Sequence, residues 1–424
     1  MRRRRGQHIL QGTGLVVGER QEKGVRIIEA TISNLVEDVR DEVIGWRRHL
    51  HQNPELSFKE EQTSQFVYET LESFRGLELS RPTPTSVVAR LAGGETGRTV
   101  ALRADMDALP ITEENDFEFV SNNEGVMHAC GHDGHTAMLL GAAKVLLEMK
   151  EGIQGEVRFL FQHAEELYPG GAEEMVEAGV MEGVDAILGI HLWSGIEAGK
   201  IGVVYGPMLA APDTFRIVIN GRGGHAAMPH QTADSVAIGA QVVTNLQHIV
   251  SRNTDPLDNV VLSVTKFTGG TMHNIIPGTV EMIGTVRTLD EEVRKHVPET
   301  MERVIKGVTA AHDSSYEFEY QRGYRPVIND EEVTRVLEET VREAFGEAAL
   351  EMMRPVMGGE DFSAYQQTTP GTFVFVGARN EEKGITAPHH HPRFTVDENA
   401  LENGVKMHVN AAFKLLEEES EGRV

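Results

Sequence analysis

The chain has 424 residues, which is long for a single domain and predicts two domains with a sizeable apolar core. Forty basic against 65 acidic side chains give a formal net charge of −25, which argues against nucleic acid and against an anionic membrane as partners. A single cysteine, Cys130, excludes a disulfide within the chain, and no apolar run is long enough to span a bilayer, so we expect a cytoplasmic globular protein.

The N-terminal residues carry no clear structural pattern. Their arginine-rich start suggests a signal peptide at first sight, but glutamines and glycines interrupt the apolar centre that such a peptide needs. We predict that residues 1–24 form a disordered extension and that ordered structure starts near Val25. From there apolar residues recur at helical spacing, which predicts helices over residues 30–52 and 60–74.

The following part alternates short β-rich runs with helical ones. Strands are predicted over residues 86–91, 99–104, 156–162 and 185–191, and helices over residues 136–150 and 172–179. Such alternation is typical of a mixed, mostly parallel sheet wrapped by helices.

After this part the order of elements changes to β, α, β, β, α, β. The strands are predicted over residues 214–221, 259–267, 279–289 and 315–322, and the helices over residues 234–250 and 291–312. This order indicates an inserted α+β unit of the ferredoxin-like kind, with a four-stranded antiparallel sheet and two helices on one face. The α/β pattern resumes after about Pro326, so we predict a main domain of residues 25–212 and 325–424 and an inserted lid of residues 213–324.

The densest group of reactive side chains is the segment HACGHDGH, residues 128–135, with one thiol, three imidazoles and a carboxylate. Its glycines permit a tight loop, and the helical run that follows places the segment at a helix start, where the helix dipole favours a thiolate. Cys130 and His132 are therefore candidate metal ligands. The alternative is an inert buried cysteine beside capping residues, which three neighbouring histidines disfavour.

Other donor side chains follow predicted strands directly. They are Asp105 and Asp107, Glu165 and Glu166, His191, and His389, His390 and His391. Because open α/β sheets bind ligands at the carboxyl ends of their strands, we expect these side chains to converge on one rim. Taken singly, His191 is explained as a core histidine and the glutamate pair as a solvated turn. Asp105 suits a place behind a ligating histidine, where a carboxylate fixes the tautomer.

The number of donors indicates two metal ions. One thiolate, three imidazoles and a carboxylate exceed the three protein ligands that a single catalytic zinc ordinarily takes. Mixed sulfur, nitrogen and oxygen donors favour Zn²⁺ first, with Mn²⁺, Co²⁺ or Ni²⁺ as replacements. Of two adjacent glutamates, one can bind metal while the other transfers protons.

A set of motifs in a fixed order runs from about Trp46 to Leu401. The motifs are WRRHLHQNPELSFKE, ALRADMDALPI, MHACGHDGHTAMLLGAA, FQHAEE, GIHLW, GRGGHAAMPH, HNIIPGTVEMIGTVRT, MGGEDFSAY and HHHPRFTVDE. In these the chain resembles the metal-dependent aminoacylases and the hippurate and auxin-conjugate hydrolases, relatives of the carboxypeptidase G type. The resemblance is greatest to the bacterial N-acyl-L-amino-acid amidohydrolases.

The resemblance implies a role for each donor. It makes Cys130, His132, Glu166, His191 and His390 the metal ligands and Glu165 the general base. His390 is chosen because the family's ligand stands two residues before a proline, here Pro392, although His389 and His391 stay open as alternatives. Where the exopeptidase branch has a histidine ligand two residues before an aspartate, this chain has Arg103 before Asp105, which weakens the peptidase interpretations.

The resemblance also gives the lid a function. His225 is expected to reach the active site of a partner subunit and to polarise the scissile carbonyl, while Asn274 and Arg287 are expected to hold the substrate carboxylate. This implies a homodimer or a homotetramer. On its sequence alone, His225 is a histidine in a glycine-rich turn.

The function implied is hydrolysis of the amide bond of N-acyl-L-amino acids to a carboxylic acid and a free amino acid. A metal-bridging water attacks, and Glu165 acts as base and then as acid. The alternatives are an exopeptidase or an amino-acid-conjugate hydrolase and, from another class, a non-catalytic protein that binds metal or acyl amino acids. The last would be expected to lack Glu165 or a ligand, and this chain lacks neither.

Overall fold

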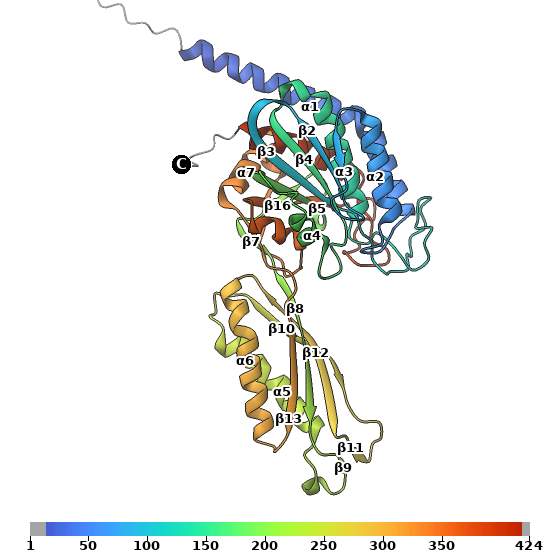
Figure 1. Cartoon of the computed structure of the whole chain (residues 1–424), viewed down its shortest axis with the longest axis vertical. Coiled ribbons are helices and arrows are strands. Elements are labelled where there is room, and N and C mark those ends of the chain that lie inside the picture. The colour runs from blue at the N-terminus through green and yellow to red at the C-terminus, as the bar shows by residue number, and fades with distance from the viewer. Residues whose placement is uncertain (1–13, 418–424) are drawn as a thin grey trace, which may run out of the picture.

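An eight-stranded sheet forms the centre of the larger of two bodies in the computed structural model, which describes residues 14–417 (Figure 1). The strands in sheet order are β1 (Glu78–Ser80), β2 (Val87–Ala92), β4 (Gln154–Gln162), β3 (Gly94–Asp105), β5 (Ala186–Glu197), β16 (Gly371–Arg379), β6 (Ile201–Val203) and β15 (Leu350–Met352). The four central strands β4, β3, β5 and β16 run in parallel, and β1, β2 and β6 pair antiparallel to their inner neighbours. The predicted mixed, mostly parallel sheet is confirmed.

Helices cover both faces of this sheet. One face carries α1 (Gly14–Gln52), α2 (Glu61–Phe74), α3 (His132–Glu148), α7 (Glu331–Phe345) and α8 (Asn399–Glu417), and the other carries α4 (Gly171–Glu177) and a 3-10 helix (Asp361–Gln367). Neighbouring strand residues alternate between two cores: Val374 and Val376 pack on the first face, and Phe373 and Phe375 on the second. Because both faces of β16 are buried, its sequence is a continuous run of apolar residues.

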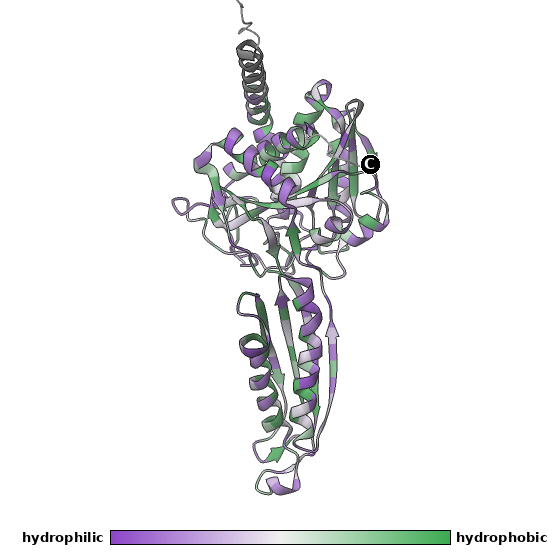
Figure 2. Cartoon of the chain, turned by 90° about the vertical axis from the view of Figure 1, so that its left-hand side faces the viewer, coloured by the Kyte–Doolittle hydropathy of each residue, from purple (hydrophilic) through white to green (hydrophobic). Residues whose placement is uncertain are grey.

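The smaller body is an antiparallel sheet in the order β10-β12-β8-β13 with two helices. Its elements are β8 (Ala211–Asn220), α5 (Ser235–His248), β10 (Val260–Thr268), β12 (Thr279–Thr288), α6 (Glu291–Ala310) and β13 (Ser315–Gln321). Burial alternates residue by residue along β12 and β13, and hydrophilic and hydrophobic residues alternate along these elements in Figure 2. This is the pattern of elements buried on one face only.

Two short pairings complete the fold. The strands β9 (Gly224–His225) and β11 (Ile275–Ile276) pair at the end of the smaller body that lies farthest from the main sheet (Figure 1). The strands β7 (Gly206–Leu209) and β14 (Val327–Asn329) pair in the main body, next to the two segments of chain that connect the bodies.

One buried carboxylate, that of Asp213, contacts both of the segments that connect the two bodies. Asp213, on the outgoing strand β8, pairs with Arg294 of α6 at 2.6 Å and accepts hydrogen bonds from the backbone N–H of Gly323 and the hydroxyl of Tyr320 on the returning segment. The division into domains at residues 213 and 324 stays a prediction, and this clamp lies at both of its boundaries.

The N-terminal boundary differs from the expected one. Helix α1 begins at Gly14 and not near Val25, since no proline interrupts the helix upstream of Val25. The remainder of the predicted extension, residues 1–13, lies outside the described residues. Between residues 14 and 417 no helix combines the length and apolar character that crossing a membrane requires.

Candidate metal centre

Five segments bring donor side chains to the carboxyl edge of the parallel strands. Asp105 ends β3 and Asp107 follows it, Glu165 and Glu166 follow β4, His191 lies in β5, His390 follows β16, and Cys130 and His132 stand at the start of α3. His191 is in the middle of its strand and not at its end, because β5 continues alongside β16 to Glu197. We call Cys130, His132, Glu166, His191 and His390 the donor cluster.

The donor atoms are close enough to share cations. The Sγ of Cys130 lies 3.5 Å from Nε2 of His191, and Oε1 of Glu166 lies 3.2 Å from Nε2 of His390 and 4.0 Å from Nε2 of His132. Three overlapping groups, each with its donor atoms within 4.8 Å of one another, are Cys130–His132–His191, Cys130–Glu166–His390 and His132–Glu165–Glu166. Overlapping groups with shared members suit two ions held side by side.

Two buried atoms of the cluster make no hydrogen bond with any described residue, although other donor atoms of the cluster lie 3.2 to 4.0 Å away. These are Nε2 of His132 and Oε1 of Glu166. Buried polar atoms are ordinarily hydrogen-bonded, and both of these are lone-pair donors that point into the cluster. The residues present therefore fit a pair of divalent cations.

Hydrogen bonds on the far side of the histidine rings fix which nitrogen faces the cluster. Nδ1 of His132 lies 2.9 Å from the carbonyl oxygen of Asp107 and 3.2 Å from its carboxylate, and Nδ1 of His191 lies 2.7 Å from the carbonyl oxygen of Leu192. In both residues Nε2 is left free to bind a metal. The backing carboxylate of His132 is thus Asp107, whereas Asp105 lies 2.6 Å from Nδ1 of His135 and 3.7 Å from Nε2 of His132.

The negative charge of nearby carboxylates disfavours the thiolate form of Cys130. Burial, together with the carboxylates of Glu166 and Glu165, raises the pKa of the Cys130 thiol well above its ordinary value. The sequence-based expectation that the start of α3 favours a thiolate is therefore outweighed by these carboxylates. A divalent cation reverses the balance, because it stabilises thiolate and carboxylate together.

Glu165 stands beside the cluster in an acidic environment. Its backbone N–H donates to Asp107 at 3.0 Å, and its carbonyl oxygen accepts a hydrogen bond from the hydroxyl of Tyr324 at 2.8 Å. Burial raises the pKa of the Glu165 carboxyl well above its ordinary value, and Glu360 and Glu166 raise it further. A carboxyl whose pKa is raised is a stronger base than an ordinary glutamate, and this suits a group that takes up a proton and returns it.

A buried cation balances these carboxylates. Arg103 donates to Asp105 at 2.7 Å, to Glu360 at 2.9 Å, to Asp361 at 3.0 Å and to Gln162 at 2.8 Å. The arginine that replaces a histidine ligand of the exopeptidase branch is therefore a structural counter-ion. Sequence reasoning missed the part played by Glu360 and Asp361, and the acidic pair after two glycines in MGGEDF was the available signal.

A cavity of about 440 Å³ opens onto the cluster, and its walls come from both bodies. The lining includes Glu165, Trp193, Leu209, Arg287, Tyr324, Met357, Gly359, His389 and His390. Arg287 of β12 is half-buried and makes no hydrogen bond or ion pair with any described residue, so its guanidinium is free for an anion. A Cβ atom at position 359 would lie 2.8 Å from Pro212, so the absence of a side chain at Gly359 allows this wall of the cavity to pack against Pro212.

The three consecutive histidines point to different places. His390 adopts a left-handed backbone with φ 64° and directs Nε2 to Glu166. His389 also lines the 440 Å³ cavity, but its Nε2 accepts the backbone N–H of Ser194 at 3.0 Å. His391 lines a different cavity. The geometry favours His390 as the ligand.

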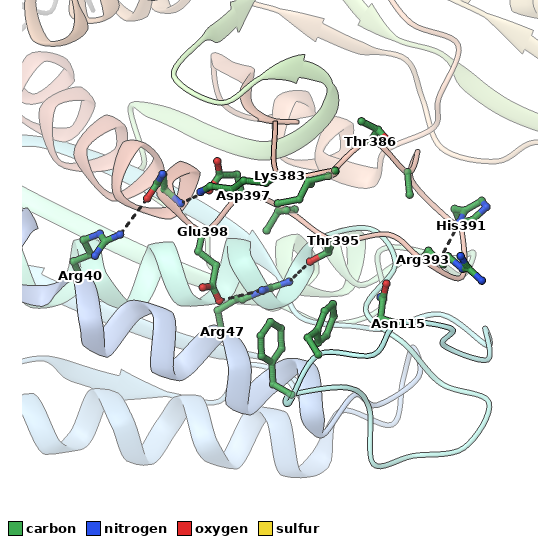
Figure 3. Close-up of a pocket in the computed structure, with 17 residues that line it drawn as sticks. Arg40, Arg47, Asn115, Lys383, Thr386, His391, Arg393, Thr395, Asp397 and Glu398 are labelled. Carbon is green, nitrogen blue, oxygen red and sulfur yellow. Dashed lines mark hydrogen bonds and ion pairs between the residues drawn. The ribbon is translucent and has the colours of Figure 1, made fainter. Parts of the chain in front are cut away.

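That second cavity is larger, about 730 Å³, and His391 lines it together with side chains of α1, of the segment around Asn115 and of residues 383–399 (Figure 3). Each of its four cations already has a carboxylate partner: Arg40 with Glu402, Arg47 with Asp133, Lys383 with Asp397 and Arg393 with Glu114. The cavity is lined by a neutralised ion-pair network, and we assign the chemistry to the smaller cavity that contains the donor cluster.

The two remaining predicted residues are not near the cluster in the same chain. His225 and Asn274 are exposed and neighbour each other, with the N–H of Ala226 donating to the carbonyl oxygen of Asn274 at 3.1 Å. They belong to β9 and the segment before β11, at the far end of the smaller body (Figure 1). We call residues 224–231 and 272–276 the tip.

Comparison with known proteins finds relatives over most of the chain. The model of Peptidase family M20/M25/M40 matches residues 101–414. An N-acyl-L-amino acid amidohydrolase of Geobacillus stearothermophilus is 69% identical over 301 residues, which cover 71% of this chain and 81% of that protein. Thermostable carboxypeptidase 2 of Saccharolobus solfataricus is 43% identical over 90% of this chain and 98% of its own length.

A solved structure extends the likeness to both bodies. The crystal structure of a dinuclear metal-binding peptidase of the M20 family from Bacillus subtilis is similar with a TM-score of 0.79 and 37% identity. The match covers 90% of this chain and 99% of that one.

Proposed function

The chain belongs to peptidase family M20/M25/M40, and from this premise we propose that it hydrolyses the amide bond of N-acyl-L-amino acids to a carboxylic acid and a free amino acid. The observation that carries the proposal is the convergence of the donor cluster beside Glu165 on one cavity. The high identity to an N-acyl-L-amino acid amidohydrolase supports the substrate class.

Cys130, His132, Glu166, His191 and His390 would hold two divalent cations. Thiolate, imidazole and carboxylate together suit Zn²⁺ first, with Mn²⁺, Co²⁺ or Ni²⁺ as alternatives. When bound, such ions acidify a water and polarise the scissile carbonyl.

Glu165 carries the proton transfers. Its carboxylate removes a proton from the attacking water and then gives that proton to the nitrogen of the departing amine, which breaks the carbon–nitrogen bond. The buried hydrogen bonds from its backbone to Asp107 and from Tyr324 hold the residue in place between the two transfers. Arg287 orients the substrate by pairing its guanidinium with the substrate carboxylate.

His225 and Asn274 serve the cavity of a second copy of the chain. They are exposed at the tip, far from the cavity of their own chain, and exposed apolar side chains of Met228, Met272 and Ile275 accompany them there. Such a patch suits burial against another protein surface. In the assembly His225 donates to the developing oxyanion and Asn274 contacts the substrate carboxylate. Light scattering distinguishes a homodimer from a homotetramer.

An exopeptidase is the second candidate, because the chain is 43% identical to a carboxypeptidase over nearly its whole length. Both reactions place a free α-carboxylate against Arg287 and differ only in the group that lies beyond the scissile carbonyl. An amino group in that place distinguishes a dipeptide from an N-acyl amino acid.

A substrate panel on protein of measured metal content tests the proposal. We expect the highest kcat/KM for N-acetyl or N-benzoyl amino acids, lower values for dipeptides, and a large loss for N-acyl amino acid amides, which lack the carboxylate that Arg287 would bind. Preference for dipeptides would establish the exopeptidase, and indifference to the carboxylate would remove Arg287 from its role.

A further inference from the structure

The loop that carries Glu165 and Glu166 is held by its backbone, and two buried carboxylates do the holding. Asp107 accepts the N–H of Glu165 and the N–H of Glu166, each at 3.0 Å. Glu60 accepts the N–H of the preceding residue, Ala164, at 2.8 Å. Three successive backbone N–H groups therefore donate hydrogen bonds to two carboxylates, and the direction of both glutamate side chains depends on these bonds.

Ala164 needs this support because its backbone is in the left-handed region, with φ 50°. A residue with a Cβ is strained there, and Ala164 is neither a glycine nor an asparagine, the residues that adopt this conformation most readily. Its side chain is fully buried, so solvent gives no alternative partner for its N–H. The turn at Ala164 rotates the chain between β4 and Glu165.

Glu60 is placed to stabilise strained backbone. The same oxygen, Oε1, accepts the N–H of Phe58, which also has a left-handed φ of 64°, at 3.0 Å. The other oxygen accepts the hydroxyl of Thr85 at 3.1 Å. The carboxylate is fully buried and belongs to none of the donor groups formed by the described residues, so its contacts serve the backbone and not a cation.

We propose that Glu60 is a positioning residue for the reaction: its carboxylate holds Ala164 in the left-handed conformation that aims Glu165 at the attacking water, whereas the N–H of the ligand Glu166 is held by Asp107. The inference rests on the proposed role of Glu165. It assigns a function to the glutamate at the end of the motif HQNPELSFKE, which lies more than a hundred residues before the loop it acts on.

The test is a double-mutant cycle of Glu60→Gln and Ala164→Gly. Glu60→Gln keeps the shape but replaces the carboxylate that accepts the Ala164 N–H with a weaker amide acceptor, and we expect kcat to fall about 10-fold with KM and metal content unchanged. Ala164→Gly alone has little effect. In the double variant kcat recovers most of the loss, because glycine adopts the left-handed conformation without help. Asp185→Asn is the matched control, since Asp185 also accepts a backbone N–H, that of Thr99, at the opposite edge of the sheet.

Three outcomes overturn the inference: full activity of Glu60→Gln, loss of metal in step with activity, or no recovery in the double variant. If Glu60→Gln does not fold, Glu60→Asp gives the same cycle with the charge kept and the reach shortened. A further variant separates this inference from the proposed function. In a Glu165→Gln background, Glu60→Gln should cause no additional loss of kcat. Full activity of Glu165→Gln itself would instead refute the proposed role of Glu165 as the base, and with it the role that we give to Glu60.

Discussion

The edge of the main sheet and the tip of the smaller body hold the two parts of the proposed active site, and they are built in opposite ways. At the edge His132 and Glu165 are buried, and their hydrogen bonds to oxygen atoms of Asp107, together with one that the Tyr324 hydroxyl donates to Glu165, fix their orientation. At the tip His225 is exposed on a strand of two residues. In the proposed scheme the group that moves protons is preorganised within one chain, whereas the contact to the substrate carbonyl would come from a second copy of the chain.

The test with the largest expected effect on activity is removal of the metal. Exhaustive chelation should abolish hydrolysis, and Zn²⁺, Co²⁺ or Mn²⁺ should restore it, because without a divalent cation nothing acidifies the attacking water, and burial and nearby carboxylates raise the pKa of the Cys130 thiol. Activity and metal content are measured on the same samples. Full turnover in protein verified as metal-free would contradict the scheme.

The second test takes away the base and leaves the donor cluster. Glu165→Gln should lower kcat by about 10²- to 10⁴-fold and keep the metal content, since Glu166 and the other ligands are intact. Glu173→Gln, which changes an exposed glutamate on α4, should behave as the unaltered protein. Comparable turnover of Glu165→Gln and the unaltered protein would remove Glu165 from the base role.

The third test is directed at the tip. His225→Ala should lower kcat about 10²- to 10³-fold through the loss of one donor to the oxyanion, with His230→Ala as the control from the same exposed segment. Mixing His225→Ala with Glu165→Gln under conditions of subunit exchange should then give more activity than either variant, because one mixed cavity regains both residues. No gain on mixing, with exchange verified, would place His225 in its own chain's cavity or outside the reaction.

The smallest expected effect concerns how the edge is held. Arg47 donates to Glu398 and Thr395, on the segment that follows His390 (Figure 3), and also to Asp133, next to His132. It thereby links two segments that carry members of the donor cluster. Arg47→Lys cannot make all three bonds, and we expect metal affinity to fall about 10-fold with little change in kcat after reloading.

The neighbouring Arg48 provides the control for that variant. It is partly exposed and, among the described residues, pairs with Glu398 only, so Arg48→Lys should leave metal affinity unchanged. Equal weakening by both substitutions would mean that the ion pairs with Glu398, and not the link to Asp133, govern the site.

The sequence predicted the parts of this arrangement that follow from periodicity. The alternating runs gave the main sheet and the inserted four-stranded unit, and donors placed after strands indicated one shared edge. Pairings between distant side chains are not visible in such patterns. Asp105 and Asp107 both follow β3, and only the backbone path decides that Asp107 contacts Nδ1 of His132. Strands of three residues, such as β6 and β15, are too short to show any period.

The position of β16 in the sheet constrains how the chain can fold. β16 lies between β5 and β6, which are consecutive in sequence, yet it is made only after the whole smaller body has been synthesised. A growing polypeptide therefore has a gap between two early strands, with their backbone groups unpaired, until nearly the last segment arrives. His390 follows that strand, so the proposed donor cluster would be complete only late in biogenesis, and fragments released by premature termination would lack one of its proposed ligands.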